Sequence, residues 1–211
     1  MKVLVIIPLL NPPLSFFKDI IPLLKNQSVL IEILLISSGG ILPDGDYTTI
    51  VIDKKEFNHA NTRNKTLEYD ADYYLFMTQD ATPFDEYLIE NLLKPFSNED
   101  VVVSYARQVP YGDAHITEEF ARGRNYPNLS IVKSKDDIKT LGIKTFFSSD
   151  SCAMYRGDYF RKVGGFTKDL NTSEDMEFAA RAILENKKVA YSAEARVYHS
   201  HVYGVADLFK R

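Results

Sequence analysis

The sequence predicts an α/β fold built on a sheet that is parallel in its first half. Residues 3–8 form an unbroken apolar run rich in β-branched side chains, which is typical of a strand buried on both faces. Strand-like runs alternate with segments of helical periodicity as far as residue 94. This alternation predicts strand–helix–strand units with helices on both faces of the sheet.

Four strands and three helices are predicted in the first half. The strands cover Lys2 to Pro8, Val29 to Ile36, Tyr47 to Ile52 and Asp72 to Met77. The helices cover Leu14 to Lys25, Asn58 to Tyr69 and Pro83 to Lys94. An asparagine cap favours the start of the second helix, and a proline in the first turn favours the start of the third. Ligands of such folds bind beyond the carboxyl ends of the strands, so a site is expected in the segments that follow them.

The second half is less regular. Segment 107–144 is polar and contains one candidate helix, Ile116 to Arg124. Thr172 or Ser173 can cap a later helix that is rich in acidic residues at its start. The other predicted elements are a strand at Val101 to Ala106, an extended segment at Phe146 to Tyr155, helices at Asp158 to Val163 and Ser173 to Glu185, and short strands at Val189 to Ser192 and Arg196 to His199.

Composition narrows the class of protein. The 211 residues suit one domain, and the net charge of −4 gives no argument for nucleic acid as a partner. The single cysteine, Cys152, cannot form an internal disulfide, which favours a reducing compartment. The apolar N-terminal run is too short to span a membrane and lacks a signal-peptide cleavage site. We therefore expect a cytoplasmic protein, with peripheral contact at the inner face of the membrane left open.

Asp80 directly follows the last strand predicted in the first half. A carboxylate at the end of a strand can coordinate Mg²⁺ or Mn²⁺ that bridges a diphosphate. The same residue could simply cap the helix that follows. From the local sequence alone, the two interpretations are equally good.

Four further residues carry groups suited to catalysis or anion binding. Glu174 and Asp175 open a helix, so one can orient its neighbours while the other faces a cleft as a general base. More commonly, two acids at a helix start only complement the positive end of the helix dipole. His199 follows a strand and can bind a metal or a phosphate, although most lone histidines are structural. Arg63 lies one turn inside a helix and suits a phosphate, or else is simply exposed.

Taken in order, several segments resemble those of family 2 glycosyltransferases. Three are similar to the family's opening strand, the segment before its catalytic acid, and its acidic helix with a terminal histidine: VLVIIPLLN, RGDYFRKVGGF and TSEDMEFAARAILENKKVAYSAEARVYHSH. Three others resemble the rhamnosyltransferase branch more narrowly: FNHANTRN, FMTQDATP and FFSSDSCAMYR. The resemblance runs from Lys2 to about His201, which is nearly the whole chain.

This resemblance implies a single domain with a GT-A fold over residues 1–211. A Rossmann-like nucleotide-sugar-binding half, residues 1–106, would share a mixed central sheet with an acceptor-binding and catalytic half, residues 107–211. The implied reaction is a metal-dependent, inverting transfer of one sugar, with rhamnose the narrower expectation. The sugar would pass from a nucleoside-diphosphate sugar to a hydroxyl of a glycan or lipid-linked saccharide in cell-surface polysaccharide synthesis.

The resemblance also implies residue roles. The base would be Asp175, supported by Glu174. A divalent metal, Mg²⁺ or Mn²⁺, would be held by Asp80 and His199. The donor nucleotide sugar would be contacted by Pro8, Asn11, Ser38, Arg63 and Asp80.

The chain departs from the family pattern at two positions of the donor site. Ser37-Ser38-Gly39-Gly40 stands where the family usually has an acidic turn, and Gln79-Asp80-Ala81 where it usually has two metal-binding acids. The chain has no tryptophan, so it lacks the QxxRW pattern of processive members, which favours the addition of a single sugar.

Two other functions compete with transfer. A nucleotidyltransferase would carry a glycine-rich, basic loop after the first strand, and residues 9–15 contain neither glycine nor a basic side chain. A noncatalytic or partner-dependent module that binds nucleotide sugars is favoured by the reduced metal motif.

Overall fold

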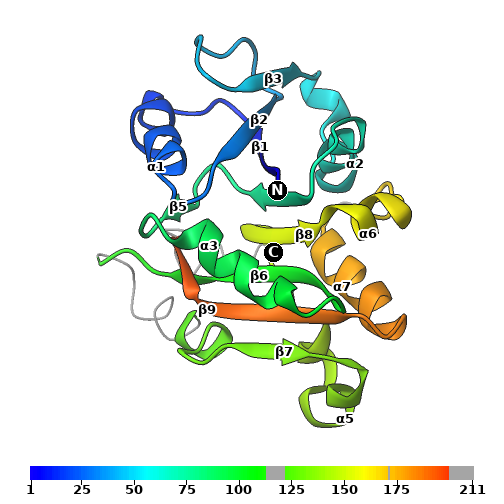
Figure 1. Cartoon of the computed structure of the whole chain (residues 1–211). Coiled ribbons are helices and arrows are strands. Elements are labelled where there is room, and N and C mark those ends of the chain that lie inside the picture. The colour runs from blue at the N-terminus through cyan, green and yellow to red at the C-terminus, as the bar shows by residue number, and fades with distance from the viewer. Residues whose placement is uncertain (113–121, 171, 200–211) are drawn as a thin grey trace, which may run out of the picture.

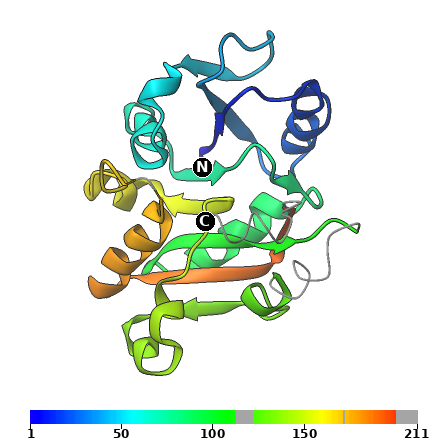
Figure 2. The same ribbon diagram turned by 180° about the vertical axis from the view of Figure 1, so that it is seen from behind.

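The structure is a computed structural model that describes residues 1–112, 122–170 and 172–199. These residues build one nine-stranded sheet with helices packed on both of its faces (Figure 1). The strand order is β3-β2-β1-β4-β8-β6-β9-β5, and β7 pairs with β9 outside this path. Seen from behind, the strands of both halves of the chain belong to the same sheet (Figure 2).

The first half confirms the predicted parallel sheet. Its strands are β1 (Val3–Leu9), β2 (Ile31–Ser37), β3 (Thr48–Val51) and β4 (Tyr73–Met77). β1 pairs in parallel with β2 and β4, and β2 pairs in parallel with β3. β1 is inaccessible along most of its length, which is why its sequence is a continuous apolar run.

The second half extends this sheet with strands of both directions. They are β5 (Thr82–Pro83), β6 (Val101–Val109), β7 (Ile131–Lys133), β8 (Cys152–Arg156) and β9 (Lys188–Tyr198). β8 is antiparallel to β4 and to β6, whereas β6 and β9 are parallel. The amino end of β8 therefore lies at the edge where β1, β4, β6 and β9 have their carboxyl ends.

Helices cover the two faces of the sheet and enclose two apolar cores. One face carries a π-helical turn (Phe16–Ile20), α1 (Ile21–Lys25) and α3 (Leu88–Leu93). The other carries α2 (His59–Asn64), α6 (Gly157–Lys162) and α7 (Glu174–Leu184), while α5 (Ile138–Leu141) lies beyond β7 (Figure 1). Within the described ranges, no helix has the length and apolar character needed to cross a membrane.

Several element boundaries differ from those predicted. Segment 83–94 is helical only as α3 and the 3-10 turn after it, because Thr82 and Pro83 pair with β9 as a short strand. The two short strands expected at 189–199 are one strand, β9, interrupted by an irregularity between Ser192 and Arg196. Ser173 does not cap α7 through its side chain, and its φ is +64°. Of the helix expected at 116–124, residues 116–121 lie outside the described residues.

The core beneath α6 and α7 is a cluster of aromatic rings. Phe160 is fully buried, and its ring centroid lies 5.1 Å from that of Phe166 and 5.4 Å from that of Phe178. The ring centroids of Phe76 and Tyr155, which belong to the sheet, each lie 5.5 Å from the ring centroid of Phe160. The α6–α7 layer is thereby fixed to β4 and β8, the strands that lead to the site described below.

We predict that Phe160→Ala lowers the free energy of unfolding by about 3–5 kcal/mol, because it removes a fully buried ring and leaves a cavity. Urea unfolding monitored by circular dichroism would measure the change. Leu30→Ala is the matched control, since that side chain is 94% exposed and should change stability by less than about 0.5 kcal/mol. Similar values for the two variants would contradict the packing described here.

Candidate active site

The carboxyl ends of β1, β2 and β4 meet at one edge of the sheet and are tied together there. Gln79 follows β4, and its side-chain Oε1 accepts a hydrogen bond from the Leu10 backbone N–H at 2.8 Å. The amide of Gln79 also donates to the Leu10 carbonyl at 3.3 Å. Gln79, the neighbour of Asp80, thus holds the loop after β1 in place.

Pro8, Asn11 and Ser38 lie at this edge, close to one another. Pro8 pairs with Ile36 in the β1–β2 ladder, and the hydroxyl of buried Ser38 donates to the Leu9 carbonyl at 3.0 Å. Asn11 is exposed and has a φ of +45°. The loops after β1 and β2 therefore form one surface at which an exposed amide and backbone groups can meet a ligand.

Gly39 explains part of the Ser-Ser-Gly-Gly turn. A Cβ at this position would lie 2.5 Å from the Asn11 backbone nitrogen, closer than real Cβ atoms approach other atoms. A glycine is therefore required for the two loops to approach this closely. The turn is adapted to Asn11 instead of presenting an acid.

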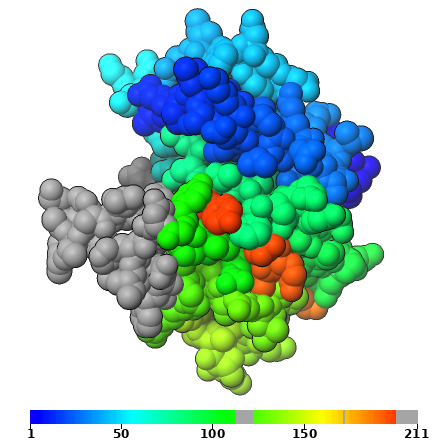
Figure 3. All heavy atoms as spheres, turned by 90° about the vertical axis from the view of Figure 1, so that its left-hand side faces the viewer, coloured from blue at the N-terminus to red at the C-terminus, as the bar shows by residue number. Residues whose placement is uncertain are grey.

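Asp80 and His199 come from distant parts of the chain and are brought together by the pairing of β5 with β9. Asp80 Oδ1 lies 3.3 Å from His199 Nε2. The other ring nitrogen of His199, Nδ1, lies 2.9 Å from the side-chain oxygen of Gln108 at the end of β6. Figure 3 shows the orange-red end of β9 at the surface between segments near residue 80 and near residue 110. The pair predicted to hold a metal is thus assembled by the fold.

The donor chemistry of this pair suits a divalent ion. In the tautomer of His199 whose Nδ1–H donates to Gln108, the lone pair of Nε2 points at the Asp80 carboxylate. A cation bound by both groups would stabilise this arrangement. Among the described residues, no group of three or more histidine, cysteine or acidic side chains could hold a metal. The pair can supply two ligands, and the diphosphate of a nucleotide could supply others.

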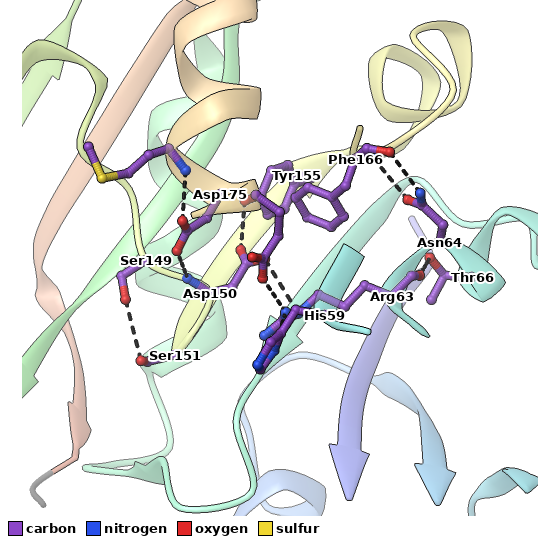
Figure 4. Close-up of polar contacts among 12 residues, drawn as sticks. His59, Arg63, Asn64, Thr66, Ser149, Asp150, Ser151, Tyr155, Phe166 and Asp175 are labelled. Atoms are coloured by element: carbon purple, nitrogen blue, oxygen red, sulfur yellow. Dashed lines mark hydrogen bonds and ion pairs between the residues drawn. The ribbon is translucent and has the colours of Figure 1, made fainter. Parts of the chain in front are cut away.

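Glu174 and Asp175 separate into different surroundings at the start of α7. Glu174 is buried, and its Oε1 accepts a hydrogen bond from the Arg63 guanidinium. Asp175 is partly exposed and lines a cleft. Its Oδ2 accepts from the Asp150 backbone N–H at 3.1 Å, and its Oδ1 accepts from the Met176 N–H at 2.7 Å (Figure 4). Glu174 is thus enclosed in a buried ion pair with Arg63, whereas Asp175 faces the cleft.

Arg63 is not at the edge formed by the loops after β1 and β2. Its guanidinium is 3% exposed, donates to Glu174, and lies with Nε 3.4 Å from Asp150 Oδ2. Nη1 also lies 3.4 Å from His59 Nδ1. Arg63 therefore contacts two acids of the protein itself, at the floor of the cleft that Asp175 lines.

The cleft is open and has a volume of about 430 Å³. It joins residues predicted to be functional from α2, α7 and the end of β9. Its walls also carry polar side chains that follow β4 and β6 or precede β8. The lining residues with polar or charged side chains include Thr78, Gln108, Arg122, Tyr126, Ser149, Asp150, Asp175 and His199. Asp175 and the Asp80–His199 pair therefore belong to the same region, with His199 as the link.

The segment FNHANTRN owes its composition to docking against the second half. Asn58 caps α2 by accepting from the Asn61 N–H at 3.1 Å. Asn64 holds the backbone of Phe166 with two hydrogen bonds of 2.8 and 2.9 Å (Figure 4). Arg63 binds Glu174 from the same helix. The two resembling segments FNHANTRN and VGGF thus contact each other directly.

Asp150 and Gln108 are site residues to which the sequence reasoning assigned no role. Asp150 stood within the quoted segment FFSSDSCAMYR, and that resemblance was the one available signal. Burial raises the pKa of Asp150 to about 8, although the charge of Arg63 opposes this shift. The pKa of His59 is lowered, mainly by burial and secondly by the positive charge of Arg63. Gln108 lies in the polar segment that follows the predicted strand Val101 to Ala106. In the structure this strand, β6, continues to Val109 and includes Gln108.

Similar proteins were found at the level of family, sequence and fold. Residues 94–211 match the model of glycosyl transferase family group 2. The O-antigen chain rhamnosyltransferase RfbN of Salmonella typhimurium is 40% identical over 223 residues, which cover 100% of this chain and 70% of that protein. The O-antigen chain rhamnosyltransferase WbaN of Salmonella anatum is 44% identical over 164 residues, which cover 77% of this chain and 52% of that protein.

Two solved structures share the fold. Residues 1–349 of S. aureus TarS match with a TM-score of 0.71 at 14% identity, over 95% of this chain and 60% of that one. The mannosyltransferase PcManGT from Pyrobaculum calidifontis, in complex with GDP-Man and Mn²⁺, matches with a TM-score of 0.67 at 13% identity, over 93% of this chain and 56% of that one. The chain thus spans little more than half the length of these structures.

We predict that the stability difference between Asp150→Asn and the wild type depends on pH. An acid whose pKa is raised in the folded state contributes stability that is fully present below its unfolded pKa of about 4 and is lost as pH rises through about 8. The amide cannot ionise, so the variant should lack this loss. Urea unfolding at intervals from pH 4.5 to 8.5 would measure it.

Asp70→Asn is the control for this experiment, because the Asp70 side chain is 93% exposed. The wild type should lose stability relative to Asp150→Asn across the range, while Asp70→Asn follows the wild type. Parallel curves for all three proteins would contradict the protonated, buried state of Asp150.

Proposed function

This chain belongs to glycosyl transferase family group 2, and we propose that it transfers one rhamnose from a nucleoside-diphosphate sugar to a hydroxyl of a glycan or lipid-linked saccharide. The likeness to two O-antigen chain rhamnosyltransferases supports this choice of sugar and a role in cell-surface polysaccharide synthesis. The chain spans 70% and 52% of the length of those two proteins.

The observation that carries the proposal is that three predicted site residues lie in one region. The carboxylate of Asp175 faces the cleft, His199 lines the same cleft, and Asp80 lies beside His199. A noncatalytic binding module would need no carboxylate held toward the ligand space by two backbone N–H groups. The GT-A fold expected from the sequence is confirmed by the solved structures that share it.

The proposed chemistry is an inverting displacement. The acceptor oxygen attacks the anomeric carbon from the side opposite the diphosphate, the new carbon–oxygen bond forms, and the bond to the diphosphate breaks with its electron pair. Asp175 accepts the proton of the acceptor hydroxyl, a step typically worth about 10²–10⁴ in rate. Glu174 supports this base from its buried pair with Arg63.

The donor would lie along the edge of β1, β2 and β4. Pro8, Asn11 and Ser38 would contact its nucleoside. Asp80 and His199 would hold Mg²⁺ or Mn²⁺, with Gln108 orienting the histidine ring. When bound, the metal would neutralise charge that grows on the departing diphosphate.

Arg63 takes a different role in this proposal from the donor contact that its sequence position suggested. Its guanidinium binds Glu174 and lies beside Asp150, so it acts through these carboxylates and positions the floor of the cleft. We place the enzyme on the cytoplasmic side, where nucleotide sugars are available, with peripheral contact at the inner membrane face toward a lipid-linked acceptor.

We expect Asp175→Asn to abolish transfer while leaving donor affinity within about threefold of the wild type, because the change removes the base and keeps its shape. Transfer from a panel of nucleoside-diphosphate sugars, with and without Mn²⁺, would be followed by mass spectrometry, and donor affinity by calorimetry. Glu177→Gln is the matched control, since Glu177 lies on the same helix and pairs with Arg181 outside the cleft. Near-normal transfer by Asp175→Asn would refute the assignment of the base.

We also expect Asp80→Asn to weaken Mn²⁺ binding by at least about tenfold, because the exposed carboxylate is one of two protein ligands in the proposed site. The electron paramagnetic resonance of free Mn²⁺, titrated with protein and nucleoside diphosphate, would measure the affinity without any turnover. Asp46→Asn removes one acid that is 94% exposed and should bind Mn²⁺ as the wild type does. Equal affinities in all three proteins would remove Asp80 from the metal site.

A further inference from the structure

Asp150 is a buried carboxylate that the proposed reaction does not use. It is 2% exposed, and its Oδ1 accepts a hydrogen bond from the Tyr155 hydroxyl at 2.6 Å. Its backbone N–H donates to Oδ2 of Asp175 at 3.1 Å (Figure 4). One residue therefore contacts the base through its main chain and is anchored to β8 through its side chain.

Arg63 connects the two ends of this contact. Its Nη1 donates to Glu174, the neighbour of Asp175 on α7, and its Nε lies 3.4 Å from Asp150 Oδ2. The three side chains are at most 7% exposed. A guanidinium presents its donors in a rigid fork, so the spacing between the segment before β8 and the start of α7 is set by one planar group.

The Asp175 carboxylate has little freedom between these two elements. Oδ1 accepts from the Met176 N–H within α7, and Oδ2 accepts from the Asp150 N–H across the cleft floor. A displacement of Asp150 would release Oδ2 and allow the carboxylate to turn. The orientation of the base thus depends on the position of a residue on another element.

Resting on the proposed function, we propose that Asp150 is a positioning residue, which holds the Asp175 carboxylate in the orientation that reaches the acceptor hydroxyl. Arg63 and Glu174 keep the two segments at the distance this requires. Asp150 is not the base in this arrangement, because one of its oxygens is bound by Tyr155, the other faces Arg63, and the side chain is buried.

The charge of the cluster agrees with this role. The groups that face Asp150 from neighbouring elements are Arg63 and His59 of α2, Glu174 and Asp175 of α7, and Tyr155 and Cys152 of β8. Burial lowers the pKa of His59 and raises the pKa values of Tyr155 and Cys152, so these three are neutral near pH 7. Burial also raises the pKa of Asp150 to about 8, and its carboxyl is then protonated at neutral pH. Arg63 and Glu174 form an ion pair, and Asp175 is the carboxylate of this cluster that faces the cleft.

This charge state has a consequence at alkaline pH. Loss of the Asp150 proton above about pH 8 places a third carboxylate beside those of Asp175 and Glu174, where like charges in a buried site repel strongly. The N–H contact between Asp150 and Asp175 then weakens, and the base is no longer held. The wild-type kcat should therefore fall as pH rises through about 8.

The experiment compares Asp150→Asn with Asp150→Ala in the full chain. The amide keeps an acceptor for Tyr155 and cannot ionise, so at pH 7 its kcat should stay within about threefold of the wild type, and it should not fall up to pH 9. Alanine leaves the segment unanchored, and kcat should fall about 10- to 100-fold at every pH, with the donor KM changed less than about threefold. Circular dichroism and urea unfolding establish that both variants are folded.

Two results would overturn the positioning role. One is an Asp150→Asn variant as inactive as Asp175→Asn, since the ionisable group itself would then be needed. The other is a wild-type kcat in Asp150→Ala, or, if alanine fails to fold, an alkaline fall in Asp150→Asn identical to that of the wild type. Wild-type protein that transfers no sugar from any donor would refute the proposed function instead, so the two failures are distinguishable.

Discussion

The buried guanidinium of Arg63 is the contact on which the geometry of the candidate site depends. It extends from α2 in the first half of the chain to Glu174 on α7 and Asp150 before β8 in the second. A charge this deeply buried is costly unless its partners surround it, and removal of one partner of such a pair typically costs about 3–5 kcal/mol. The halves are therefore joined by a polar contact at the place where the chemistry is proposed, in addition to the apolar core beneath α6 and α7.

The second constraint is the direction of the strands. β8 runs antiparallel to β4, so the residues before β8 lie at the carboxyl end of β4, where the Thr78 N–H donates to the Ser151 carbonyl at 3.2 Å. β9 runs parallel to β6, which carries Gln108 and His199 to the same edge. An all-parallel continuation would have placed the segment before β8 at the opposite edge. The mixed sheet is thus what allows the two halves of the chain to share one site.

The reduced acidic motif can be understood from its neighbours. Gln79 stands beside Asp80 and forms two hydrogen bonds with Leu10, so this position holds the loop after β1. His199 follows β9, and its Nε2 lies 3.3 Å from Asp80 Oδ1, so it would supply the second metal-binding atom of the proposed site. The metal site proposed for this family 2 member would therefore combine ligands across the sheet, where the usual pattern places two acids within one loop.

The sequence by itself determined the α/β class, the four parallel strands, the family, and the positions of Asp80, Asp175 and His199 at element ends, because apolar runs and ordered segments are local properties. It could not separate Glu174 from Asp175 by surroundings, place Arg63 against two acids, or identify Asp150 and Gln108. Those assignments depend on residues far apart in the chain, such as Arg63 and Glu174, which are 111 positions apart. Only the tertiary structure decided them, because burial and charge pairing arise when the sheet brings distant segments together.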